Sequence, residues 1–137
     1  MSRKILIWGL VLAMLSVVFG AFGAHALKNL VPSDKLTIFE TGVRYQFMHA
    51  FALLALSLYV AQNGNTHLGN ASIRWTSQFF LLGILFFSGS LYLLTFQTLC
   101  SYNYSKIIGP ITPLGGLCFI LGWAFWAAHV WRHKVDK

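Results

Sequence analysis

The sequence predicts an all-α membrane protein, a bundle of four transmembrane helices with a short interfacial helix before the second span. Two observations support this fold class. Hydrophobic residues make up 57% of the 137 residues and charged residues only 9%, too few to cover the surface of a soluble domain. Four uncharged runs are long enough to cross a bilayer, where lipid accepts an apolar outer surface. The length allows one domain, residues 1–137.

The first span is predicted at about residues 5–25. Ile5 to Ala24 is uncharged, and at ~1.5 Å per residue it covers a hydrocarbon core of ~30 Å. A cleaved signal peptide is the alternative, because a basic start precedes the run and Ala24-His25-Ala26 has a small-x-small pattern. The apolar run is longer than that of a usual signal peptide, so we expect a retained helix.

The second span is predicted at about residues 43–61, after the interfacial helix. Pro32-Ser33-Asp34 begins a new helix with Ser33 as its cap. Apolar residues then recur at helical spacing, with Gly42 as a soft point before the span. The residues with this spacing are Leu36, Phe39 and Val43.

The third and fourth spans are predicted at about residues 76–99 and 112–131, inside two further uncharged stretches. Pro113 suits the first turn of the fourth helix, and Thr112 is its expected N-cap. Small residues recur at intervals that favour close contact between helices in lipid. They are Gly9 with Ala13, Gly20 with Ala24, and Gly115 and Gly116 with Gly122.

The basic residues indicate orientation rather than nucleic-acid binding. The net charge is +7, but the Lys and Arg side chains stand at the ends of apolar runs, and no basic run carries interleaved aromatic residues. With four spans, one side of the membrane has Arg3, Lys4, Arg74, Arg132, Lys134 and Lys137, and the other has Lys28, Lys35, Arg44 and Lys106. Six against four favours cytoplasmic termini, with membrane lipids as expected partners and nucleic acid excluded.

The candidate functional residues are the polar side chains that lipid would reject. They form a predicted polar cluster of His25, Glu40, Arg44, Tyr45, Gln46, His49, Ser88, Ser90, Tyr92 and Thr112. Most of them belong to the outer half of the bilayer in the four-span arrangement, so a cavity should open outward. The cytoplasmic half shows mainly Trp123, Trp126 and Trp131, which are typical interface anchors.

The charged side chains and the histidines each have a structural and a functional interpretation. Glu40 and Arg44 are four residues apart, so they are expected to pair on a helix, or else to serve a ligand or a proton. His25 and His49 are expected to bond to neighbours, because their spacing matches no known ligand pattern; no metal and no cofactor is predicted. His129, near the cytoplasmic end, is expected to be solvated.

The remaining polar signals have ordinary structural interpretations. Ser88 and Ser90 are expected to bond back to backbone carbonyls, with a polar cavity lining as the alternative. Cys100 and Cys118 lie at different predicted depths, which favours two free thiols over a disulfide. The sequence has no CxxC, phosphate loop, GxSxG or HExxH motif, so no catalytic residue is assigned.

Several long motifs resemble one bacterial membrane family. They are Gly20-Ala-Phe-Gly-Ala-His-Ala-Leu27, Phe39-Glu-Thr-Gly-Val-Arg-Tyr-Gln46 with His49-Ala50, Phe87-Ser-Gly-Ser-Leu-Tyr-Leu93, Ile111-Thr-Pro-Leu-Gly-Gly116 and Leu121-Gly-Trp123. Together they are similar to the domain of unknown function 423 family, which is related to the eukaryotic transmembrane protein 256. The resemblance implies a four-span inner-membrane protein and no particular reaction. Met48 departs from the aromatic residue of the family pattern.

Three functions remain open at the level of sequence. The first is a non-enzymatic membrane module that scaffolds or assists a partner; the partner would be another copy of the chain, in a self-associating homo-oligomer, or another membrane protein. The second is a small oligomeric transporter or channel that uses Glu40, Arg44 and the histidines for an ion or polar solute. The third is a membrane enzyme acting on a lipid or quinone, with His25 or His49 as base and Glu40 as its orienting residue.

Overall fold

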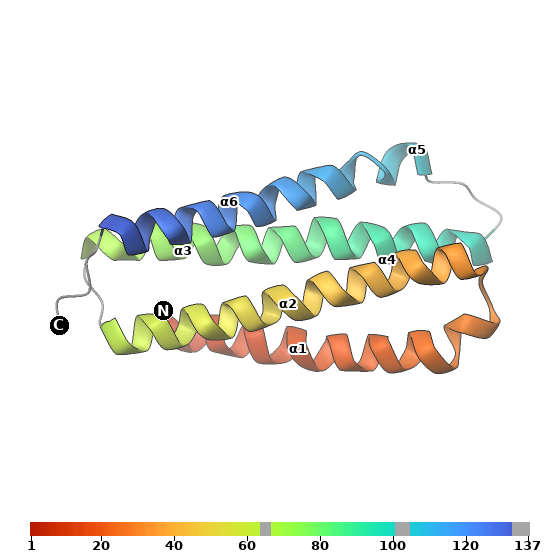
Figure 1. Ribbon diagram of the computed structural model, residues 1–137, viewed down its shortest axis with the longest axis horizontal. Helices are drawn as coiled ribbons and strands as arrows, with labels where there is room; N and C mark the ends of the chain where they lie inside the picture. The colour runs from red at the N-terminus through yellow and green to blue at the C-terminus, as the bar shows by residue number, and fades with distance from the viewer. Residues whose placement is uncertain (64–66, 101–104, 133–137) are drawn as a thin grey trace.

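The computed structural model describes residues 1–63, 67–100 and 105–132, although the side chains of residues 67–70 are not described. Two helical hairpins lie side by side (Figure 1). The first hairpin consists of α1 (Ser2–His25), the short η1 (Leu27–Asn29) and α2 (Ser33–Asn63). The second consists of α3 (His67–Gly83), η2 (Ile84–Ser88), α4 (Gly89–Phe96), η3 (Gln97–Leu99), α5 (Ser105–Ile108) and α6 (Ile111–Arg132).

The described helices confirm the predicted fold class. Four stretches are long and apolar enough to cross a membrane: Ser2–Asn29, Ser33–Asn63, Ala71–Leu99 and Ser105–Arg132. Each is longer than the predicted span, because helical structure continues past the hydrocarbon core. Lys134, Lys137 and His133 lie outside the described residues, as do the side-chain contacts of His67.

The interfacial helix expected before the second span is the first part of α2 and continues into the span without a break. Gly42 lies inside this helix and is buried. A Cβ atom at Gly42 would meet the ring of Tyr92 at 2.8 Å, so this glycine allows α4 to approach closely. Gly42 is therefore a packing position in α2.

The two inner helices of the bundle are α2 and the continuous rod formed by α3, η2 and α4. α1 packs along α2, and α6 packs along α3 and η2. Figure 1 shows α2 beside α4 at one end and farther from α3 at the other, where α1 begins and α6 ends. Large side chains fill the wider end; Tyr59 and Phe80 both contact the ring of Trp126 there.

Glycines let aromatic rings seat deeply between α6 and the rod. Gly83 faces the ring of Phe119, and a Cβ atom at Gly122 would lie 2.6 Å from the ring of Phe80. Gly115 faces the backbone of Phe87, which lies in the π-helical turn η2. Such close backbone approach is how helices associate in lipid, where no hydrophobic force drives them together.

Candidate functional site

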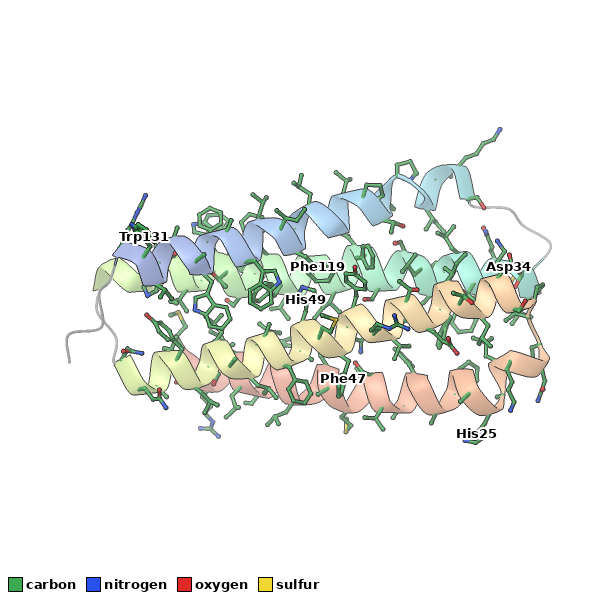
Figure 2. All side chains as sticks on the ribbon, viewed as in Figure 1. His25, Asp34, Phe47, His49, Phe119 and Trp131 are labelled. Atoms are coloured by element: carbon green, nitrogen blue, oxygen red, sulfur yellow. The ribbon has the colours of Figure 1, made fainter. Side chains whose placement is uncertain are left out.

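The predicted polar cluster divides into an interior set and a surface set. Buried or half-buried members are Gln46, His49, Ser88, Ser90, Tyr92 and Thr112, and exposed members are His25, Glu40, Arg44 and Tyr45. Figure 2 shows His49 midway along the bundle beside Phe119, with His25 and Asp34 at one end and Trp131 at the other. The two sets have different contacts and are described in turn.

Gln46 joins three helices in the interior. Its side chain is 3% exposed. Its Nε2 donates a 3.1 Å hydrogen bond to the carbonyl of Leu12 in α1, and its Oε1 accepts a 2.9 Å bond from the hydroxyl of Tyr92 in α4. The hydroxyl of Ser16 donates to the same Leu12 carbonyl at 2.8 Å. The amide therefore has a partner at each end, as a buried polar group requires.

His49 joins the two hairpins. Its Nδ1 lies 2.8 Å from the carbonyl oxygen of Tyr45, and its Nε2 lies 3.2 Å from the indole Nε1 of Trp123. A carbonyl only accepts and an indole N–H only donates, so the proton is assigned to Nδ1 and the ring is neutral. The ring also stacks on Phe119, with centroids 3.5 Å apart. Both nitrogens are occupied and neither faces open space.

Ser90 and Thr112 form a third contact, between α4 and α6. Their hydroxyl oxygens are 2.7 Å apart, and Ser90 donates back to the carbonyl of Phe87 at 2.8 Å. α6 begins at Ile111, so Thr112 lies within the helix, and the predicted N-cap role is wrong. The expected back-bond is present at Ser90 but absent at Ser88, whose buried hydroxyl in η2 has no hydrogen-bond partner.

Glu40 and Arg44 lie on the outer surface of α2. The ion pair predicted between them is not formed; the acid–base contact found in the described part of the chain joins Lys35 to Asp34 at 3.8 Å. The side chains of Glu40 and Arg44 are both exposed. They line a shallow groove between α1 and α2, with a volume of about 210 Å³, together with Gly20, Gly23, Phe39, Val43 and Phe47.

The groove lies at membrane depth. A Cβ atom at Gly23 of α1 would be 3.2 Å from Phe39, and one at Gly20 would be 3.8 Å from Val43. In the sequence Glu40 directly follows Phe39, and Arg44 directly follows Val43. Glu40 and Arg44 are therefore level with the last part of the uncharged α1 run, near the end of the predicted first span.

His25 and Tyr45 complete the surface set. His25 is exposed at the end of α1, and its backbone carbonyl accepts a 3.3 Å bond from the side chain of Asn29. Tyr45 is 38% exposed and packs on Phe87, with ring centroids 4.5 Å apart. In the described structure no hydrogen bond or ion pair links Glu40 to a histidine. The structure therefore does not assemble the histidine–carboxylate pair that the enzyme hypothesis requires.

No metal or disulfide site is assigned. The described residues bring no three His, Cys, Asp or Glu side chains together in a way that would hold a metal ion. Cys100 is exposed and Cys118 is half-buried, and both are free thiols as predicted.

Sequence reasoning missed three residues that form contacts between helices. Trp123 was expected only as an interface anchor, yet it donates to His49; its position one turn after Phe119 was an available signal. His129 was expected to be solvated, but it is 7% exposed and its ring meets Tyr59 edge-on. Thr95 in α4 donates a 3.1 Å hydrogen bond to the carbonyl of Lys35 and joins the two hairpins at the end of the bundle where α2 begins.

These contacts define a class: a multi-pass, all-helical membrane protein whose interior polar side chains join its helices. Comparison with known sequences then identifies the family. The chain belongs to the family described as Protein of unknown function (DUF423), which matches residues 19–116. The predicted resemblance is therefore confirmed, and the quoted motifs lie within the matched residues except Leu121-Gly-Trp123.

Relatives from three organisms are membrane proteins by name. A UPF0382 membrane protein of Staphylococcus saprophyticus is 39% identical, over 88% of this chain and 91% of its own. The UPF0382 membrane protein YwdK of Bacillus subtilis is 36% identical, over 88% and 90%. The UPF0382 inner membrane protein YgdD of Escherichia coli is 33% identical, over 90% and 86%. No solved structure matches the chain.

Proposed function

We propose that the protein is a non-enzymatic, self-associating module of the bacterial inner membrane, with both termini cytoplasmic, that scaffolds or assists a membrane partner. The observation that carries the proposal is the closed interior. Gln46, His49 and the Ser90–Thr112 pair all use their hydrogen-bonding groups to join helices. Interior polar groups whose hydrogen bonds are made within the protein stabilise a fold and leave little for a substrate.

The outer helices provide the surface on which a partner would pack. α1 and α6 contribute few buried residues to the bundle, and most of their side chains face outward. Exposed side chains on α1 include those of Trp8, Met14 and Val18. In lipid, a helix face of this kind associates through shape and small residues rather than through apolar burial. Gly116, a half-buried small residue of α6, offers such a position.

A transporter is the second candidate, because Glu40 and Arg44 lack a protein partner at membrane depth in the described structure. Their groove, however, opens sideways between α1 and α2 and is lined mainly by apolar side chains. A path across the membrane would need polar groups continuing inward from it. The interior polar residues next along α2 are Gln46 and His49, and each already has hydrogen-bond partners within the bundle.

Reconstitution tests the proposal against the transporter. Purified full-length protein, labelled separately with donor and acceptor dyes, is placed in liposomes over a range of protein densities. Energy transfer that saturates at low density and falls on dilution with unlabelled protein supports a self-associating module. A monomer at every density, together with ion or solute flux that Glu40→Gln abolishes, would overturn it in favour of transport.

A further inference from the structure

The groove between α1 and α2 carries opposite charges in a fixed order along the membrane normal. α2 enters the membrane at its N-terminal end, and Glu40 precedes Arg44 by one helical turn, about 6 Å. The carboxylate is therefore nearer the membrane surface, and the guanidinium lies deeper. This order depends only on the direction of α2, so it holds in whichever leaflet the helix begins.

The geometry of a helix favours rotamers of Glu40 and Arg44 that lean toward that membrane surface. Helical side chains point back toward the N-terminus of their own helix, which for α2 is the surface end. An arginine set below the headgroups extends its apolar stem along the helix and places its guanidinium near the phosphates. Arg44 therefore reaches phosphate depth, and Glu40 reaches the layer just above it.

The apolar walls of the groove, beside and beyond the charges, suit a hydrocarbon chain. Val43 and Phe47 line it from α2, and Gly20 contributes no side chain from α1. The nearest atom to a Cβ at Gly20 would be Val43 Cγ1 at 3.8 Å, so the groove remains open there. The site thus has a charged head and an apolar floor.

We propose that this groove binds a phospholipid with a primary amine in its headgroup, of the phosphatidylethanolamine class. In such a lipid the phosphate lies next to the hydrocarbon layer and the ammonium lies farther out, which is the reverse of the protein's charge order. Arg44 binds the phosphate, Glu40 accepts N–H bonds from the ammonium, and the upper part of one acyl chain lies along Val43 and Phe47. Charge-assisted bonds of this kind are the strong ones.

Other ligands would complement fewer of the charged groups in the groove. A choline headgroup offers Glu40 a positive charge but no N–H donor, and a glycerol headgroup offers hydroxyl donors but no positive charge, so neither supplies both to the carboxylate. A second helix would need an opposite pair at the same two depths. The inference deepens the proposed function: it rests on the outer surface being the working face of the module, and it names a lipid that this face holds.

Native mass spectrometry of the full-length protein with added lipids tests the assignment. The probes are phosphatidylethanolamine, phosphatidylcholine and phosphatidylglycerol with identical acyl chains. The wild type is expected to retain the ethanolamine lipid about tenfold better than the other two, as one charge-assisted bond implies. Glu40→Gln should remove this preference while phosphate binding persists. Arg44→Gln should weaken retention of all three lipids, and Arg44→Lys should restore it in part.

Matched controls separate the site from general effects. Asp34→Asn removes another exposed acid of α2 and should leave the preference intact. Gly20→Leu fills the groove and should lower retention of all three lipids, whereas Ala21→Leu, at the exposed next position, should not. Circular dichroism and thermal melts of each variant verify that it is folded.

Equal retention of the three lipids by wild type, or a preference that survives Glu40→Gln in a folded protein, would overturn the proposal. Self-association that Glu40→Gln abolishes without any change in lipid preference would assign the groove to a protein partner and would also overturn it. The energy-transfer measurement reads self-association independently, so failure of the proposed function and failure of the lipid site are distinguishable.

Discussion

The indole N–H of Trp123 donates a 3.2 Å hydrogen bond to Nε2 of His49 across the interface between the two hairpins. His49 belongs to α2 and Trp123 to α6, so this contact joins helices that are distant in sequence. The ring of Phe119, stacked 3.5 Å from the imidazole, holds it in place. A neutral histidine therefore forms a hydrogen-bonded contact between the two hairpins midway along the bundle.

This contact predicts one histidine tautomer. Nitrogen-15 NMR of the protein in nanodiscs at neutral pH should show His49 protonated at Nδ1 and unprotonated at Nε2, because Nε2 accepts from Trp123. Trp123→Phe should lower the unfolding free energy by about 0.5–1.5 kcal/mol. Trp131→Phe, at an 89% exposed position, should have no such effect. A proton found on Nε2 would contradict the assigned contact.

The Gln46–Tyr92 bond predicts a measurable coupling between α2 and α4. Tyr92→Phe removes the hydroxyl that donates a hydrogen bond to Gln46 and should lower the unfolding free energy by about 0.6 kcal/mol, the average for such bonds in a membrane bundle, and by no more than about 1.7 kcal/mol. Tyr45→Phe is the control, because the Tyr45 ring is largely a packing contact on Phe87. Unfolding in mixed detergent micelles measures both variants. With Gln46→Leu added, the effects of the two changes should be less than additive.

Close helix approach at Gly115 predicts a large cost for a single methyl group. A Cβ atom there would collide with the backbone of Phe87, so Gly115→Ala should destabilise the protein by about 1–3 kcal/mol. Gly89→Ala is the matched control: nothing lies within 4 Å of its Cβ position, and alanine favours a helix by up to about 1 kcal/mol. Equal stability of the two variants would show that α6 does not pack on η2 as described.

The proposed orientation predicts which thiols react from outside the cell. Cys100 is exposed at the end of the third span, so a membrane-impermeant maleimide should label it in spheroplasts. In a Cys100→Ser background, Lys4→Cys should be labelled only after the membrane is permeabilised, because α1 begins on the cytoplasmic side. The opposite pattern would reverse the proposed topology. Cys118, inside α6, should react in neither case.

Much of the fold followed from local patterns, and less of the site did. Uncharged runs predicted the four spans, because lipid selects for apolar length over any other property. The same patterns predicted a Glu40–Arg44 pair from a spacing of four, yet spacing does not fix rotamers, and both side chains turn outward. The prediction that His129 is solvated was wrong. It rested on the position of His129 near a helix end, whereas its contact with Tyr59 depends on how α6 packs against α2.

The amino-acid sequence by itself determined that this is a four-span helical membrane protein with polar residues gathered along α2 and α4. Hydropathy and charge act residue by residue, so they are readable without contacts. Tertiary structure decided which polar groups meet: Gln46 with Tyr92, and His49 with Trp123. Those pairings depend on how the two hairpins pack together. A hydrogen bond between two helices forms only when both helices have the right rotation about their axes and the right position along the membrane normal. The sequence of one helix alone does not determine this relative placement.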